Sequence, residues 1–307
     1  NVANGMLNWK TGKFLPHDPK YKSTIRINAA YDPSVADNVC VREFMGDVFP
    51  QDGVWLAAEI LGYCMTPTTK LQKAFILYGV GSNGKSTYID IINNILGPAN
   101  VSHSSLSSIS ENRFASSALF GKLANTCADL DYRAIERSDL FKQIVGGDII
   151  QAEDKNKPIY QFTPFARLIF STNQLPKSDD RTDAFLRRLI IVPFEKIFEG
   201  RGVNTEIKDK LLDSPARSFW LNLAIEGLRR LDKQGGFTKC AATERALEEY
   251  RTEIDHVYDF CQTHLEQGNP DQGFWASTKI LYDTYLAWAK ENGIRNPCAS
   301  ISFGMRL

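Results

Sequence analysis

The sequence lacks the features that mark several classes of protein. Its six cysteines are scattered along the chain, with no C-x-x-C pair and no histidine at a spacing that suggests zinc. No apolar run reaches the length of a membrane span, and no segment has the form of a signal peptide. We therefore expect an intracellular protein with reduced, mostly buried thiols and no membrane partner.

An excess of either charge is also absent. Lysine and arginine total 36 residues, and aspartate and glutamate total 36 as well. Binding to nucleic acid would therefore depend on a local basic patch and not on the overall charge. The length of 307 residues and the hydrophobic fraction of 43% predict a globular protein of two or three domains.

What the chain does contain is a glycine-rich loop. Residues 79–87 match the pattern G-x-x-x-x-G-K-[ST] of the phosphate-binding P-loop. A β-prone run at 74–78 precedes the loop, and a helical pattern follows it and stops at Gly97-Pro98. Strand, loop and helix form the context that the motif requires, so we predict a nucleoside triphosphate site. Its binding residues are Gly79, Gly81, Ser82, Asn83, Gly84, Lys85, Ser86 and Thr87.

The residue types in this loop suit the chemistry of phosphate binding. Backbone N–H groups at a helix N-terminus form a nest for negative charge, and the glycines let the backbone come close to it. We expect Lys85 to reach the β- and γ-phosphates and the Ser86 hydroxyl to bind Mg²⁺. The predicted cofactors are ATP and Mg²⁺.

Two aspartates follow the next predicted strand. The run 123–128 ends in Asp129-Leu130-Asp131, and an apolar strand ending in acidic residues after a P-loop is typical of the Walker B motif. One carboxylate would hold Mg²⁺ or its water, and the second would activate the attacking water. We assign Asp129 to the metal and leave open which of Asp129 and Asp131 activates water. The alternative is a pair of solvated turn carboxylates.

A third strand, predicted at 167–173, also ends in a polar residue. Asn173 would orient the attacking water against the γ-phosphate if this strand lies beside the P-loop. The alternative is that its side chain only caps the strand.

Two basic motifs complete the candidate site. Two β-prone runs around a polar turn predict a hairpin with Lys155, Asn156 and Lys157 at its tip, which is otherwise an ordinary solvated hairpin. Arg187 and Arg188 directly precede the buried run 189–194. One of them would form an internal ion pair, and the other would reach the γ-phosphate of a neighbouring subunit as an arginine finger.

The patterns divide the chain into four parts. Residues 1–70 are irregular and then helical, 71–200 form the α/β core, and 201–240 form a helical extension. Residues 241–307 form a helical domain in which two helices joined by a short turn suit the start of a helix-turn-helix or winged-helix module, although any small helical domain shows the same pattern. The family resemblance described below implies a winged-helix region that is cut short here. Within these parts we expect a serine-rich loop at 102–110 and one helical run at 243–265.

The order of the motifs resembles that of superfamily 3 helicases, specifically the phage, plasmid and poxvirus-type primase-helicases. The resemblance covers nearly the whole chain, and the ordered set is more specific than any single motif. The matching motifs are Gly79–Ser86, Ala128–Asp131, Gly146–Asp148 with the hairpin 155–157, Ser171–Asn173, and Arg187-Arg188. A departure is Leu130, which separates two acidic residues that are often adjacent in this family.

The resemblance implies a fold, an assembly and a partner. Members have an AAA+-like α/β core and act as hexameric rings that translocate on single-stranded DNA. It implies that the hairpin tracks DNA phosphates, that Arg188 is the finger with Arg187 in reserve, and that a primase domain lies upstream. A protein of this kind would work in the cytoplasm of a host cell.

The sequence therefore predicts an ATP-dependent DNA helicase of a phage, plasmid or viral replication protein. A second hypothesis is an ATP-switched initiator or loader that assembles on DNA without processive unwinding. A third is a P-loop kinase for a small molecule, which the absence of an evident lid-like arginine cluster disfavours. The polarity of translocation, the sequence specificity and the host stay open.

Overall fold

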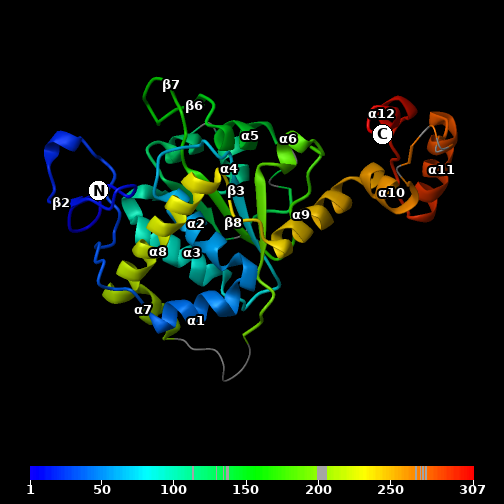
Figure 1. Cartoon of the computed structure of the whole chain (residues 1–307). Coiled ribbons are helices and arrows are strands. Elements are labelled where there is room, and N and C mark those ends of the chain that lie inside the picture. Colours follow the sequence, from blue (N-terminus) through cyan, green and yellow to red (C-terminus); the bar gives the residue numbers. More distant parts are fainter. Residues whose placement is uncertain are drawn as a thin grey trace. The chain divides into compact units, whose positions relative to one another are not determined.

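The computed structural model describes all residues except 113, 129, 134, 136, 137, 199–205, 267, 270, 272 and 274. The chain divides into two compact units, Asn1–Leu247 and Glu248–Leu307. Figure 1 shows the elements of both units along the chain. The first unit contains the glycine-rich loop.

A five-stranded parallel sheet forms the centre of the first unit. Each strand pairs in parallel with its neighbours, and β8 is buried along its whole length, as expected where both faces of a parallel sheet are covered. The carboxyl ends of the strands therefore lie at one edge of the sheet and the amino ends at the other. In spatial order the strands are β4 (Val101–Ser102), β5 (Ala124–Cys127), β8 (Arg167–Thr172), β3 (Ala74–Tyr78) and β9 (Leu189–Pro193).

The sequence predicts four of these strands, and the structure confirms them as β3, β5, β8 and β9. No pattern predicts the short strand β4. The serine-rich loop expected at 102–110 is wrong over its second half, where helix α4 (Leu106–Glu111) begins. The Ser105 hydroxyl caps this helix by accepting a hydrogen bond from the Ser108 N–H, so a serine-rich run here starts a helix.

Helices that precede the sheet in the chain and helices that follow it pack with the sheet in one hydrophobic core. Helix α3 follows the glycine-rich loop directly, and its apolar side chains are buried. The hydrophobic core includes residues of α1 (Val39–Val48), α2 (Val54–Cys64), α3 (Lys85–Leu96), α7 (Ile207–Leu212) and α8 (Ser214–Gln234).

Helices α2 and α8 pack together so closely that their backbones touch (Figure 1). A Cβ atom on Gly227 would lie 2.4 Å from the Ala58 carbonyl oxygen, and one on Gly62 would lie 2.3 Å from the Ala224 carbonyl oxygen. Only glycine fits at these two positions. The segment before the glycine-rich loop and the segment after the sheet thus form one helical layer.

A buried carboxylate fastens the same layer. Glu59 of α2 is fully buried, and its carboxylate accepts hydrogen bonds from Arg230 and Gln234 of α8 and from Thr238 beyond it. Arg230 also lies over the ring of Trp55, with its guanidinium carbon 4.6 Å from the ring centroid. These donors compensate the cost of removing the charge from water.

We expect Gly227→Ala to lower the free energy of unfolding by about 3 kcal/mol, because the added methyl group meets backbone atoms that cannot move aside. Gly46→Ala in α1 is the matched control, since a Cβ there meets nothing within 4 Å. That variant should be neutral or more stable by about 0.5–1 kcal/mol. Urea unfolding of the two variants measures the difference, and equal stabilities would contradict the close packing.

Several shorter elements lie outside the five-stranded sheet. Strands β1 (Met6–Leu7) and β2 (Phe14–Leu15) pair antiparallel near the N-terminus. Helix α5 (Asp139–Gly146) leads into the hairpin of β6 (Ile150–Ala152) and β7 (Tyr160–Phe162), which confirms the predicted hairpin. Helix α6 (Asp183–Leu186) directly precedes the two arginines.

The second unit is small and helical. Helix α9 (Ala241–Ile254) runs across the boundary between the units, and α10 (His256–His264), α11 (Thr278–Glu291) and α12 (Ser300–Gly304) follow. The latter three share a core that includes Phe260, Tyr285 and Phe303. No strand occurs among the described residues of this unit.

The helical run predicted at 243–265 is interrupted. The Asp255 carboxylate caps α10 by accepting hydrogen bonds from the N–H groups of Val257 and Tyr258, and this cap separates α9 from α10. The domain boundaries predicted at 70, 200 and 240 stay predictions. None of the helices in the described part of the chain combines the length and apolar character of a membrane span.

Candidate functional site

The glycine-rich loop connects the carboxyl end of β3 to the first turn of α3. Gly79 has φ +154° and Gly84 has φ +90°, values that favour glycine. A Cβ on Gly79 would lie 2.4 Å from the Phe194 carbonyl oxygen, and one on Gly84 would lie 2.7 Å from Val48 Cγ1. Both glycines are therefore required by backbone conformation and by space.

Lys85 is buried in this loop, where oxygen atoms surround its ammonium group. Nζ donates to the Gly79 carbonyl oxygen, and it lies 3.1 Å from Asn83 Oδ1 and 3.1 Å from Asn173 Oδ1. Asn83 in turn donates to the Phe194 carbonyl oxygen at 2.9 Å. The structure thus brings the lysine of the loop and the asparagine at the end of β8 together.

A cavity of ≈ 690 Å³ opens beside the loop. The predicted residues from Gly81 to Thr87 all line it, whereas Gly79 does not. Ala128, Ser171 and Asn173, from the carboxyl ends of β5 and β8, line its floor. Because β8 lies between β3 and β5, Asn173 stands between the loop and the end of the strand that leads to Asp129.

The first predicted aspartate, Asp129, lies outside the described residues. Asp131 is exposed and is not among the residues that line the cavity; its carboxylate accepts a hydrogen bond from the Arg133 N–H at 2.9 Å. The Leu130 N–H donates to the Ser171 carbonyl oxygen at 3.1 Å, which holds this segment against the end of β8.

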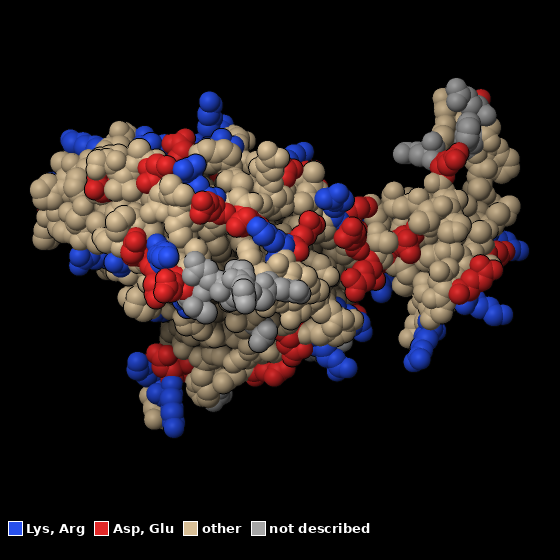
Figure 2. All heavy atoms as spheres, turned by 90° about the horizontal axis from the view of Figure 1, so that it is seen from below, with Lys and Arg blue, Asp and Glu red and all other residues tan. Residues whose placement is uncertain are grey.

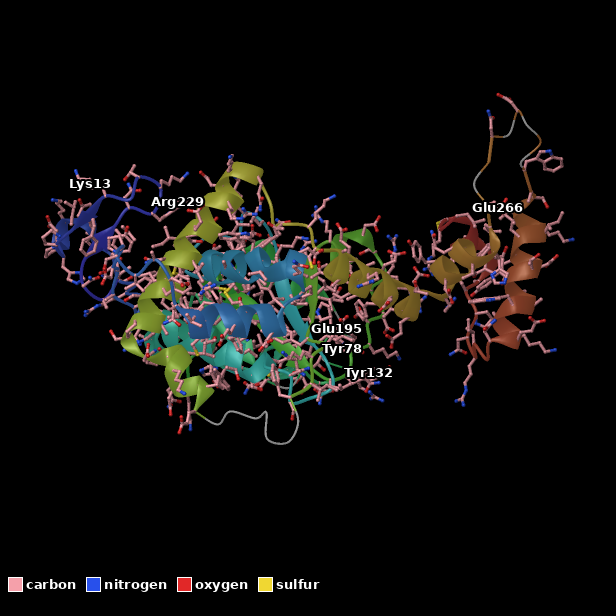
Figure 3. The ribbon with its side chains drawn as sticks, turned by 60° about the horizontal axis from the view of Figure 1, so that its bottom comes forward. Lys13, Tyr78, Tyr132, Glu195, Arg229 and Glu266 are labelled. Atoms are coloured by element: carbon pink, nitrogen blue, oxygen red, sulfur yellow. The ribbon has the colours of Figure 1, made fainter. Side chains whose placement is uncertain are left out.

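Three of the residues labelled in Figure 3 lie at, or shortly after, the carboxyl ends of strands. Tyr78 ends β3, Glu195 follows β9, and Tyr132 follows the segment after β5, and all three lie on the same side of the ribbon. The carboxyl ends of the parallel strands therefore lie together, at the edge where open α/β sheets generally bind ligands.

Arg187 and Arg188 lie at the opposite edge of the sheet. The Arg188 carbonyl oxygen accepts a hydrogen bond from the Ala74 N–H at 2.8 Å, at the amino end of β3, and the Arg187 carbonyl oxygen accepts one from Lys73 Nζ. The five residues of β3 separate this point from the loop by about 16 Å. Neither arginine can therefore serve the cavity of its own chain.

The arginine side chains differ in exposure. Arg187 is exposed, whereas Arg188 is partly buried and donates to the Ala184 carbonyl oxygen. Burial and the neighbouring charge of Arg187 lower the pKa of Arg188. No ion pair of either arginine occurs among the described residues, and the predicted internal pair stays a prediction.

The predicted DNA-contacting residues lie at the hairpin tip. Lys155, Asn156 and Lys157 are exposed, and Asn156 takes the left-handed conformation with φ +63°. Lys157 Nζ lies 3.2 Å from Asp154 Oδ2. The hairpin runs into the amino end of β8 after a short connection, and Figure 1 shows β6 and β7 on the side of the first unit away from α1 and α7.

Lys142 and Asp180 tie α5 to the loop before α6. Lys142 Nζ lies 2.8 Å from Asp180 Oδ2, and the hydroxyls of Ser138 and Thr182 donate to the same carboxylate. Burial alone would raise the pKa of Asp180, but these donors outweigh it and hold the pKa well below its ordinary value. The pair thus has a structural role beside the arginines.

We expect Asp180→Asn to destabilise the first unit by about 1–2 kcal/mol at neutral pH. A carboxyl group with a depressed pKa in the folded state stabilises the fold above its ordinary pKa, and this contribution is lost as the pH falls below about 4. The stability difference between wild type and variant should therefore shrink in acid. Urea unfolding across pH measures it, and a difference that persists unchanged at about pH 2 would contradict the assignment.

Sequence analysis missed the second wall of the cavity. Glu43, Phe44 and Asp47 of α1 line it, as do Ile207 and Lys208 of α7. Both helices lie outside the predicted core of 71–200, and neither carries a motif. Only the three-dimensional packing of α1 on the loop, at Gly84, places these residues at the site.

The fold and this loop define a class: an α/β domain with a P-loop sequence at the carboxyl edge of its parallel sheet. Three family models match separate parts of the chain: "D5 N terminal like" at 1–50, "Family of unknown function (DUF5906)" at 77–188, and "Poxvirus D5 protein-like" at 252–307. The two D5 models, together with the relative described next, support a D5-type primase-helicase family for this chain.

A related sequence and two solved structures extend the comparison. The Acanthamoeba polyphaga mimivirus protein named "Putative helicase L207/L206" is 28% identical over 263 residues, which cover 76% of this chain and 26% of that protein. The chain therefore spans about a quarter of this relative. The apo structure of the NrS-1 C-terminal region has a TM-score of 0.55 at 14% identity and covers 88% of this chain and 61% of its own. An A form apo structure of that region has a TM-score of 0.53 at 15% identity, with coverages of 73% and 53%. These two similarities concern the fold alone.

Proposed function

We propose that this chain is the motor part of a viral, phage or plasmid replication protein, an ATP-dependent DNA helicase of the superfamily 3 type. One observation carries the proposal: Lys85 and Asn173 meet at the carboxyl edge of the sheet, while the arginine pair and the lysine hairpin lie at the amino edge. In this proposal, a single subunit carries the nucleotide site at one edge of the sheet and, at the other, the arginine that would complete the site of a neighbouring subunit.

The residues beside the cavity fit Mg·ATP. Among the described contacts of Lys85 are the oxygens of Gly79, Asn83 and Asn173, which mark where phosphate oxygens would lie, and the positive-φ glycines leave room for the backbone to approach phosphate. The exposed Ser86 hydroxyl and Asp129 would hold the metal, which supplies charge neutralisation at the phosphates. Asn173 would position the attacking water, with Asp129 or Asp131 as its base.

The position of the arginines favours a ring. Because Arg187 and Arg188 lie at the edge opposite their own loop, either could stabilise the transition state only in a neighbouring subunit. A head-to-tail contact of this kind closes into a ring when the rotation between subunits allows it. We propose a hexamer with an AAA+-like core, as the family resemblance implies.

Single-stranded DNA is the proposed partner. The face of the first unit in Figure 2 carries lysine, arginine, aspartate and glutamate interspersed, without a broad basic surface. The balance of 36 basic and 36 acidic residues in the chain favours a local contact, and the exposed lysines of the hairpin tip suit phosphate binding in a channel.

The experiment that tests the proposal is ATP hydrolysis as a function of single-stranded DNA concentration, with the subunit mass measured by light scattering in the same buffer. Stimulation by DNA in a species near six subunits is the expected result. Hydrolysis and assembly without strand displacement on a forked substrate would favour the initiator or loader. An unstimulated monomer that turns over ATP would contradict the motor.

A further inference from the structure

The cavity beside the glycine-rich loop extends beyond the part that phosphates would fill. Its outer wall is made by α1, through Glu43, Phe44 and Asp47, and by α7, through Ile207 and Lys208. Helix α1 belongs to the segment matched by a different family model from the loop, and α7 belongs to none of the matched segments. The outer wall is therefore built by parts of the chain outside the motif region.

Contacts with the loop fix the position of α1. A Cβ on Gly84 would lie 2.7 Å from Val48 Cγ1 and 3.5 Å from Phe44 Cε2, so α1 rests on the backbone of the loop. Phe44 is buried and meets the ring of Trp220 edge to face, with the centroids 6.4 Å apart. Glu43 precedes Phe44 on α1 and is exposed at the cavity.

An ion pair fixes the position of α7 at the cavity, where α7 also contacts α1. Lys208 Nζ lies 2.6 Å from Asp90 Oδ2, and Asp90 stands one turn beyond the loop on α3. Ile207 and Phe198 add apolar surface next to this pair. A nucleotide whose phosphates lie at Lys85 would therefore place its sugar and base against the wall that α1 and α7 form together.

The charged side chains of the outer wall differ in their partners. Asp47 is paired with Lys196, and Lys208 is paired with Asp90. Within the described part of the chain, the Glu43 carboxylate has no ion pair, so it is available to a ligand. A carboxylate only accepts hydrogen bonds, and the ribose is the part of a nucleotide that presents two adjacent hydroxyl donors.

We propose that Glu43 binds the ribose hydroxyls of the nucleotide and makes the site select ribonucleotides over 2′-deoxyribonucleotides. This inference rests on the proposed function of the site. It assigns recognition of the sugar to the N-terminal helix α1, while the loop binds only phosphates.

Calorimetric titration of the whole chain with Mg·ATP and with Mg·dATP tests the proposal without relying on turnover. Wild type should bind ATP about tenfold more tightly than dATP, because one hydrogen bond to a charged group is lost with the 2′-hydroxyl. Glu43→Ala should bind both nucleotides with the affinity that wild type has for dATP or more weakly, so the preference disappears. Glu43→Gln keeps an acceptor oxygen and should retain part of the preference.

Glu111→Ala is the matched control, since this exposed helical glutamate does not line the cavity, and it should keep the wild-type ratio. Equal affinities of wild type for ATP and dATP would overturn the inference, as would an unchanged ratio in Glu43→Ala, and either result leaves the proposed function standing. Failure of wild type to bind any nucleotide would overturn the proposed function as well.

Discussion

Replacing Arg188 with alanine is expected to lower ATP turnover about 10³-fold or more, while the protein still folds, assembles and binds nucleotide. The reason is geometric: Arg188 lies at the amino edge of the sheet, so in the proposed ring it would act on the γ-phosphate bound by the neighbouring subunit and not on its own. Steady-state hydrolysis measured beside light scattering separates loss of chemistry from loss of assembly.

Mixing two inactive variants gives a sharper test of this arrangement. A Lys85→Ala subunit lacks the phosphate-binding lysine but still carries Arg188, and an Arg188→Ala subunit has the intact loop. Interfaces between the two kinds of subunit include composite sites with both groups, so the mixture should regain part of the activity. No recovery in mixed rings would contradict an arginine supplied by a neighbour.

Arg187→Ala is the matched control for the finger. It removes the adjacent arginine, whose side chain is exposed and whose backbone oxygen, not its guanidinium, holds Lys73. We expect it to retain most of the turnover. If Arg187→Ala is inactive and Arg188→Ala is nearly normal, the finger must be reassigned to Arg187.

The second large effect is expected at the hairpin. Replacing Lys155 and Lys157 together with alanine should abolish strand displacement and DNA stimulation, while hydrolysis without DNA stays near the wild-type level. The two lysines lie at the exposed tip, at the opposite edge of the sheet from Lys85, so their replacement does not touch the nucleotide site. The slope of log affinity against log salt should also become shallower by about 0.7 for each DNA phosphate that a lysine no longer neutralises.

Lys20→Ala provides the control for this pair. Its side chain is 66% exposed, close to the 69% of Lys157, and like Lys157 it is paired with a nearby aspartate. It should leave unwinding and the salt slope unchanged. An unwinding rate near wild type in the hairpin variant would show that DNA is held elsewhere.

The sequence was sufficient wherever a local pattern determines the structure. Three elements have such a pattern: the strand before Gly79, the hairpin around Lys155 and the strand that ends near Asn173. Each combines β-prone residues with a turn residue or a polar residue at its end, and the structure contains all three. The meeting of Lys85 with Asn173 follows from the parallel sheet, since neighbouring carboxyl ends share one edge. The catalytic roles of these residues stay predictions.

What could not be predicted depends on contacts between distant segments. Nothing near Glu43 or Lys208 in the sequence marks them as cavity residues, because the packing of α1 on Gly84 and the pair of Lys208 with Asp90 place them there. The helix at 106–111 was not predicted for a different reason: its start depends on a single serine cap within a polar run. Asp129, on which much of the predicted chemistry depends, lies outside the described residues.

The crossing of α2 and α8 at Gly62 and Gly227 has a consequence for synthesis of the chain. The sheet and its loop lie in sequence between the two halves of one helical layer, so α2 cannot complete its packing until α8 has left the ribosome. Long-range closure of this kind slows folding and prolongs exposure of apolar surface. We therefore expect fragments cut near residue 70 or 200 to aggregate, and nascent chains to become resistant to protease only after about residue 234 has emerged.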